Sequence, residues 1–97
     1  MQLIEYIGEK VNVNNPVFTG TLSLGRKANT TVGSYSIAEG ISVTASGFSS
    51  HAEGVGTVAS GDMSHAEGSG TTAAETDAHA EGGGTVALGS ESHAEGA

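Results

Sequence analysis

The sequence contains no cysteine and few basic residues, and each shortage excludes a class of protein. Without cysteine the chain can form neither a disulfide framework nor a thiolate metal site. Three basic against eleven acidic residues give a formal net charge of −8, which repels phosphate groups and anionic lipid headgroups. We therefore expect neither a nucleic-acid partner nor a membrane partner.

Large apolar side chains are also scarce in this chain of 97 residues, which is short enough to be one structural unit. No apolar run approaches the roughly 18 residues of a membrane span, and the residues after Met1 do not resemble a signal peptide. From Gly61 onward the only large apolar residues are Met63, Val86 and Leu88. This composition is typical of disorder unless a repeat replaces the missing core.

A repeat of seven residues begins at Gly33 and continues to the end of the sequence. Its sixth place is always alanine, at Ala38, Ala45, Ala52, Ala59, Ala66, Ala73, Ala80, Ala87 and Ala94. Its first place is glycine except at Glu75, and we predict turns at Gly33, Gly40, Gly47, Gly54, Gly61, Gly68, Gly82, Gly89 and Gly96. Alternate units differ, so the true period is fourteen residues and places four histidines at equivalent positions, namely His51, His65, His79 and His93.

This repeat favours an all-β fold, a β-solenoid whose fourteen-residue coil has two short strands and two glycine-marked turns. A coiled coil needs two large apolar residues per seven, and collagen needs glycine at every third place; neither pattern is present. Because side chains alternate along a strand, the fourth place (mostly Ser or Thr) and the alanines point into the coil, and the fifth and seventh places point outward. So flat a coil buries little apolar area, and we expect other copies of the chain to cover one face.

Residues 33–97 resemble the left-handed parallel β-roll of the YadA-like heads of trimeric autotransporter adhesins, which stack fourteen-residue repeats built on Ser-x-Ala-x-Gly. The closest variant is the SHAEG-type repeat of phage and prophage tail-fibre and neck-appendage proteins. It is present here as Ser50-His51-Ala52-Glu53-Gly54, Ser64-His65-Ala66-Glu67-Gly68 and Ser92-His93-Ala94-Glu95-Gly96, with Ala78-His79-Ala80-Glu81-Gly82 as a near copy. The resemblance implies a homotrimer, intertwined or side by side. Adhesin heads usually carry apolar residues where this chain has His and Glu, so collagen or matrix binding is not implied.

Residues 1–32 are interpreted as a separate lead-in to the repeat domain at 33–97. Phe18, Gly20, Leu22 and Leu24 alternate with Thr19, Thr21 and Ser23, a pattern that predicts a half-buried strand after the turn at residues 14–16. Residues 15–21 also resemble a lead-in of phage tail-fibre chains. Upstream, Leu3, Ile4, Ile7 and Val11 fit either a short helix or a strand.

The repeated His and Glu residues have three interpretations. They could be solvated surface residues, a trimer interface in which His and Glu of three chains pair around the axis, or a metal or anion site formed by symmetry-related histidines. The apolar Ile37 in the first histidine position favours the interface. The candidates for the trimer axis are Ile37, His51, Glu53, His65, Glu67, His79, Glu81, His93 and Glu95.

We expect no cofactor. We also do not prefer the metal interpretation, because single histidines fourteen residues apart are not a metal motif within one chain. Catalysis is not expected either. Adjacent strand residues such as Ser64 and His65 point to opposite faces, so they cannot form a nucleophile–base pair within one strand. Thr57, Thr71 and Thr85 recur fourteen residues apart and, by phase, should point into the coil.

The sequence therefore predicts a structural protein, a homotrimeric shaft or spacer segment of a phage or prophage tail fibre or appendage. It would link the virion to a receptor-binding end. Its partners would be itself, other virion tail components and a bacterial surface receptor reached through other parts of a longer chain. The alternative is an adhesin head on a bacterial cell surface that binds a host ligand directly.

Overall fold

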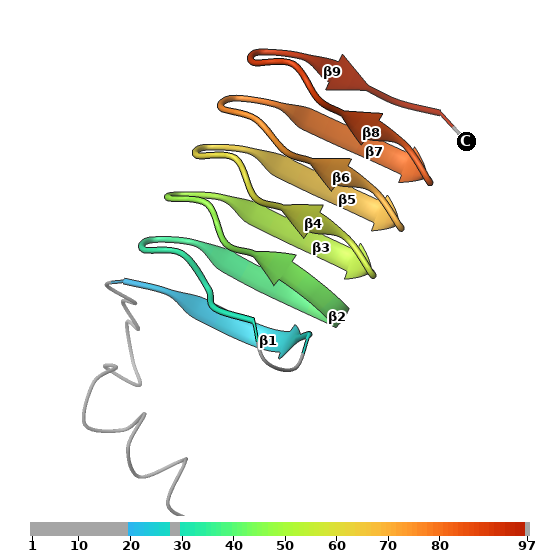
Figure 1. Ribbon diagram of the computed structural model, residues 1–97. Coiled ribbons are helices and arrows are strands. Elements are labelled where there is room, and N and C mark those ends of the chain that lie inside the picture. The colour runs from blue at the N-terminus through green and yellow to red at the C-terminus, as the bar shows by residue number, and fades with distance from the viewer. Residues whose placement is uncertain (1–19, 28–29, 97) are drawn as a thin grey trace, which may run out of the picture.

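The computed structural model describes residues 20–27 and 30–96, which form an all-β, parallel β-solenoid of about five turns (Figure 1). No helix long and apolar enough to span a membrane occurs in this described part of the chain. The strands are β1 (Leu22–Arg26), β2 (Ile37–Ala45), β3 (His51–Val55), β4 (Val58–Ala59), β5 (His65–Ser69), β6 (Thr72–Ala73), β7 (His79–Gly83), β8 (Val86–Ala87) and β9 (His93–Ala94).

Two parallel ladders form the two faces of the solenoid, and the long strand β2 takes part in both. Its first part pairs with β3 and opens the ladder β2-β3-β5-β7-β9, and its last two residues pair with β4 and open the ladder β2-β4-β6-β8. From β2 onward every paired position lies fourteen residues from its partner, as in Ile37 with His51 and Thr44 with Val58. Equivalent repeat positions therefore stack directly on one another.

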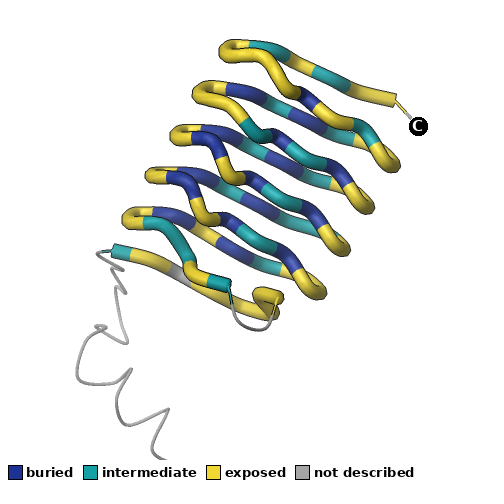
Figure 2. Tube along the Cα trace, in the orientation of Figure 1, coloured by how far each residue is buried: buried dark blue, intermediate teal, exposed yellow. Residues whose placement is uncertain are grey.

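The interior of the coil consists of small side chains. Eight of the nine repeat alanines are buried, and Ala94 in the last coil packs partly buried against them. Val43 is the only buried apolar residue larger than alanine in the described part of the chain, and buried Ser36, Ser50, Ser64, Thr57 and Thr71 fill the rest. Buried positions alternate mainly with partly buried ones along the strands (Figure 2), because successive side chains point to opposite faces.

Buried serines fix the turns at one edge of the coil. The Ser36 hydroxyl donates to the carbonyl of Gly47 at 2.6 Å and accepts a hydrogen bond from the Ser50 amide at 2.9 Å. The Ser64 hydroxyl donates to the Gly61 carbonyl at 2.6 Å, three residues earlier. These hydroxyls add to the backbone hydrogen bonds that close the turns, from the Ser50 amide to the Gly47 carbonyl and from the Ser64 amide to the Gly61 carbonyl.

Only some of the first-place glycines open turns, whereas the sequence predicted turns at all of them. Gly33, Gly47, Gly61 and Gly89 do open hydrogen-bonded turns, but Gly40, Gly54, Gly68 and Gly82 lie within strands, and Gly96 follows β9. The third place of each unit has a left-handed backbone conformation, and it is occupied by residues other than glycine at Tyr35, Ser42, Ser49, Met63, Asp77 and Glu91. The first-place glycines within strands are needed for two reasons. Their φ values lie between 108° and 123°, and the coils approach closely there, so that a Cβ on Gly54 would lie 2.0 Å from the carbonyl oxygen of Gly68.

The stacked sheet begins before the predicted boundary between residues 32 and 33. Strand β1 already pairs in parallel with β2, with Ser23 opposite Ala38 and an irregular register before Arg26. The strand predicted around residues 18–24 is therefore present from Leu22, but Leu24, which was expected on its buried face, is exposed. The predictions for Phe18 and Thr19, for the turn at 14–16, and for Leu3, Ile4, Ile7 and Val11 lie outside the described residues.

Candidate functional site

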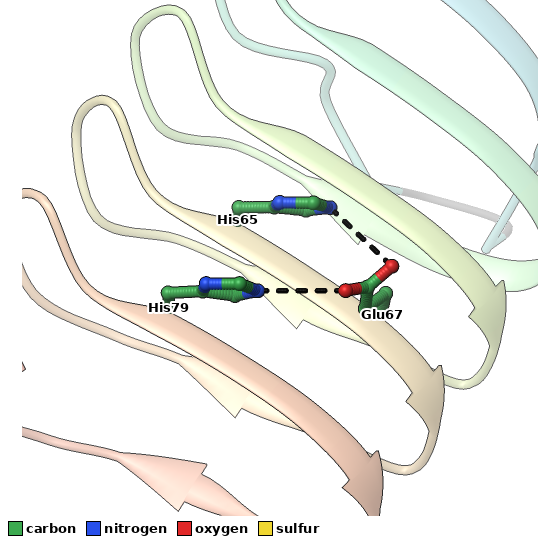
Figure 3. A group of neighbouring side chains, drawn as sticks. All are labelled: His65, Glu67 and His79. Carbon is green, nitrogen blue, oxygen red and sulfur yellow. Dashed lines mark ion pairs between the residues drawn. The ribbon is translucent and has the colours of Figure 1, made fainter. Parts of the chain in front are cut away.

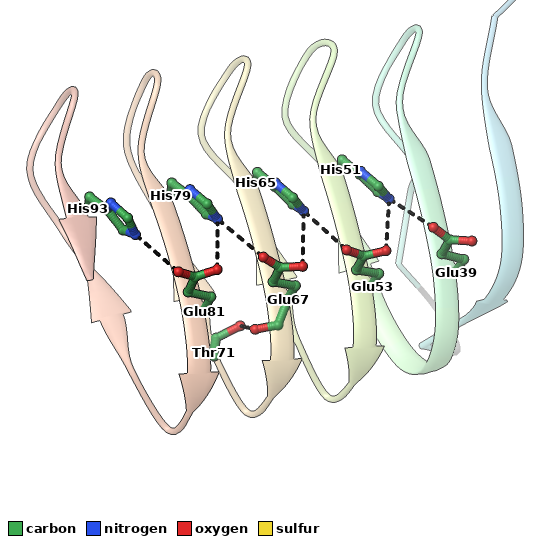
Figure 4. A network of polar contacts seen from close by, with 9 residues as sticks. All are labelled: Glu39, His51, Glu53, His65, Glu67, Thr71, His79, Glu81 and His93. Atoms are coloured by element: carbon green, nitrogen blue, oxygen red, sulfur yellow. Dashed lines mark hydrogen bonds and ion pairs between the residues drawn. The ribbon is translucent and has the colours of Figure 1, made fainter. Parts of the chain in front are cut away.

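One outward face of the solenoid carries a column of alternating His and Glu side chains (Figure 4). Each of β3, β5 and β7 places a histidine at its first residue and a glutamate two residues later, so both point to the same side. His93 and Glu95 continue the column in the last coil, and Ile37 and Glu39 begin it in β2. The column gathers the candidates for the trimer axis together with Glu39, and we call it the His–Glu ladder.

The imidazole rings of the ladder stack on one another. Ring centroids are 4.8 Å apart between His51 and His65, 4.8 Å between His65 and His79, and 4.6 Å between His79 and His93. The rings are parallel to within 7°. This spacing is that of hydrogen-bonded strands, so the backbone register sets the ring separation.

Each histidine Nε2 lies between two carboxylates, that of its own coil and that of the preceding one. His51 Nε2 is 2.9 Å from Glu39 Oε1 and 3.6 Å from Glu53 Oε2. The distances from His79 Nε2 are 3.5 Å to Glu67 and 3.7 Å to Glu81. His65 and His93 have the same arrangement. The trimer interpretation placed such contacts between three chains, whereas here neighbouring coils of one chain supply both partners.

The ladder is neither buried nor freely solvated. The side chains of His51, His65 and His79 are 34–35 % exposed, and their glutamates in the middle of the column are 32–34 % exposed. Exposure rises to 50 % at His93 and 67 % at Glu95, where the last coil has no described neighbour above it. Stacking within the chain therefore removes about two thirds of each central side chain from solvent.

Glu39 was not among the residues predicted from the sequence, although its place in the repeat is that of the other glutamates. Its carboxylate accepts a hydrogen bond from His51 Nε2, and this bond holds the pKa of Glu39 below its ordinary value of 4.5. Glu39 starts the ladder because its unit carries Ile37 instead of histidine. The repeat position of Glu39 was the signal that could have identified it.

Contacts to Nε2 weaken along the ladder. His51 has the 2.9 Å hydrogen bond to Glu39, and His65 has one of 3.4 Å to Glu53. His79 Nε2 is inaccessible to solvent and has no hydrogen-bond partner. It lies with His65 Nε2 around the carboxylate of Glu67 (Figure 3), and the donor atoms of these three residues are all within 4.8 Å of one another. His79, Glu81 and His93 form an equivalent group, and Glu39, His51 and Glu53 form a group with one histidine.

The serine and threonine residues of the repeat do not join this site. Ser64 is buried and bonded to the Gly61 carbonyl, while His65 beside it faces outward. Thr57 and Thr71 are buried and Thr85 is partly buried, and the hydroxyls of Thr71 and Thr85 donate to the carbonyls of Glu67 and Glu81. These hydroxyl groups therefore lie on the interior side of the strands, away from the imidazoles.

Comparison with protein-family models, with curated proteins and with solved structures found no match to this chain.

Proposed function

We propose that residues 33–97 form one third of a homotrimeric, left-handed parallel β-roll that acts as a shaft or spacer in a phage or prophage tail fibre or appendage. The segment would link the virion to a receptor-binding end of the fibre. The observation that carries this proposal is the register, which keeps its fourteen-residue spacing from β2 to β9 without an insertion. Uniform stacking gives the stiff, regular body that a spacer requires.

The poor core of a single coil supports association with other copies. Alanine and one valine supply the buried apolar side chains of the described residues. Nine large apolar residues of the described part remain exposed, namely Leu24, Tyr35, Ile37, Ile41, Phe48, Val55, Met63, Val86 and Leu88. A repeat segment with so small a core gains stability by burying further surface between copies.

In the proposed trimer the His–Glu ladder faces the axis. Its flat, repeating face can meet identical faces without a change of register, and Ile37 continues it as an apolar contact. Buried charged groups need partners, and each central carboxylate already contacts a histidine of its own chain. Contacts within each chain therefore offset part of the free-energy cost of removing the ladder from water at the axis.

Sedimentation equilibrium of the purified chain tests the assembly. We expect a single species with three times the mass of the chain, because the monomer lacks a sufficient core. Circular dichroism on the same sample establishes that the protein is folded. A folded species with the mass of one chain would contradict the homotrimer.

The alternative function, an adhesin head, is favoured by one patch on the edge that carries the odd-unit turns. Tyr35 and Phe48 form an edge-to-face pair with centroids 5.6 Å apart, and both are exposed, as is Met63 in the next coil. Antibodies against residues 33–97 distinguish the two roles: they should label virion tails in the proposed function. Labelling of the bacterial surface in the absence of virions would support the adhesin.

A further inference from the structure

The His–Glu ladder contains the donor set of a transition-metal site within one chain. His65, Glu67 and His79 supply two imidazole nitrogens and one carboxylate, which suit borderline divalent ions such as Zn²⁺. Residues fourteen apart in the sequence come together here because consecutive coils stack them. We propose that this chain binds one Zn²⁺-class ion between adjacent coils, using the two imidazoles that flank Glu67 or the two that flank Glu81.

The weakly satisfied nitrogen of His79 is the second observation that points to a ligand. This Nε2 is inaccessible to solvent and makes no hydrogen bond, and its nearest carboxylate oxygens, on Glu67 and Glu81, lie 3.5 and 3.7 Å away. A buried polar atom held only by such long contacts is incompletely satisfied, which is costly. His51 differs, because its Nε2 is already held by Glu39 at 2.9 Å. His79 is therefore the histidine of the ladder whose nitrogen gains most from a bound cation.

The geometry requires only a small adjustment. A tetrahedral zinc site with bonds of about 2.0–2.1 Å places its ligand atoms roughly 3.3 Å apart. His79 Nε2 is 3.5 Å from Glu67 Oε1, and His65 Nε2 is 4.0 Å from Glu67 Oε2. The two imidazole nitrogens lie within 4.8 Å of each other, so each must move by roughly 0.7 Å, a ring tilt that one-third-exposed side chains can make. Water can complete the coordination from the exposed side.

Both two-histidine groups contain His79, and its Nε2 can bind one ion at a time. The intrachain site therefore predicts one ion per chain. An ion on a three-fold axis, held by equivalent histidines of three chains, would instead give one ion per three chains. Stoichiometry separates these two arrangements, and the bound ion would fasten two coils to each other in addition to their backbone hydrogen bonds.

The test is isothermal titration calorimetry of untagged, chelator-treated protein with ZnCl₂ at about pH 7.5, above the unperturbed imidazole range at which metal binding competes with protons. We expect saturable binding of one Zn²⁺ per chain, and His79→Val should weaken it at least about tenfold. The matched control is His51→Val, which changes the same column but leaves both two-histidine groups intact, so its affinity should equal that of the wild type. Circular dichroism checks that both variants are folded.

Three results would overturn the proposal: no saturable binding by the wild type, equal binding by the His79→Val variant, or one ion per three chains. Sedimentation of the same samples keeps this question separate from the assembly. A monomer that binds one Zn²⁺ through His79 would uphold the intrachain site and contradict the homotrimer, whereas a trimer without binding would do the reverse.

Discussion

At the residue scale, the properties of each ladder side chain depend on its neighbour one coil away. His51 and His79 are both followed by Ala-Glu-Gly, yet one has a 2.9 Å hydrogen bond to a glutamate and the other has no hydrogen bond at Nε2. The difference arises from the first coil, where Ile37 leaves Glu39 with a single histidine contact, to His51. Glu39 is thereby the carboxylate whose pKa is clearly lowered.

This pKa predicts a loss of stability in acid. Because the folded-state pKa of Glu39 lies below the unfolded value, the carboxylate stabilises the fold above pH 4.5, and this contribution disappears as the pH falls through the folded-state pKa. The Glu39→Gln variant should therefore be less stable than the wild type near neutral pH, by less than about 1 kcal/mol for so exposed a pair, and the difference should shrink as the pH falls through the folded-state pKa of Glu39. Urea denaturation at a series of pH values measures the difference.

The matched control is Glu95→Gln at the other end of the ladder, where the carboxylate is 67 % exposed and its oxygen is 3.9 Å from His93 Nε2. This variant should follow the wild type at every pH. A Glu39→Gln difference that persists unchanged into acid would argue against the hydrogen bond as its cause.

At the element scale, the two-residue strands β4 and β6 are held by parallel pairing with a strand on each side, and β8 is held by its pairing with β6 at the edge of the sheet. Their hydrogen bonds require coils at constant spacing, and the glycines at the first place of each unit permit this close approach. Gly56, at the third place, is in the left-handed region with φ of 64° and has open space around it, whereas Gly54 combines a φ of 110° with the close approach of the next coil. Ser42 occupies the equivalent place with φ of 54°, so a side chain is tolerated there.

Two alanine substitutions two residues apart distinguish these roles. Gly54→Ala should lower the free energy of unfolding by roughly 3 kcal/mol or more, because its Cβ would lie 2.0 Å from the backbone of the next coil and its φ of 110° is unfavourable for a residue with a side chain. Gly56→Ala has open space around it and should cost only about 1 kcal/mol of left-handed strain. Urea midpoints measure both, and equal costs would show that close approach of the coils adds nothing to the backbone strain at Gly54.

At the scale of the whole molecule, the two outward sheet faces differ in charge. The ladder face carries all four histidines and five glutamates, whereas the outward positions of the opposite face are uncharged, namely Thr44, Ser46, Val58, Ser60, Thr72, Ala74, Val86 and Leu88. Either face could in principle meet other copies. The proposed function assigns the ladder face to the axis, and substitutions on each face test that assignment.

If the ladder lies on the axis, replacing His65 and His79 together by Val should preserve the trimer and keep or raise its melting temperature, because apolar residues of similar shape often replace buried polar pairs without loss. If the ladder is exposed, the new apolar patch should cause aggregation.

The companion variant Thr72→Glu places a charge on the opposite face and should leave the trimer mass unchanged. Dissociation by Thr72→Glu would place the interface there instead. Sedimentation and thermal denaturation provide both measurements.

The sequence alone was sufficient to predict the all-β solenoid, because strict periodicity with alanine and glycine leaves few alternatives. The inward direction of Ala66 and Ser64 and the outward direction of His65 followed from strand alternation. The role of the glycines could not be predicted from the sequence. The close approach of Gly54 to Gly68 is a contact between neighbouring coils, and the glycine itself is its only trace in the sequence. The strand at β1 was predicted, but its burial depends on which elements cover it.

What the sequence determined by itself was therefore periodic: which residues share a face, and that equivalent positions recur every fourteen residues. What only the tertiary structure decided was contact between coils. Histidines fourteen residues apart carry no metal-binding or ion-pair signal along the chain, yet parallel pairing brings their rings to 4.6–4.8 Å and inserts a glutamate of one coil between two imidazoles. Strand spacing, set by backbone hydrogen bonds, converts a sequence repeat into a ladder of side chains.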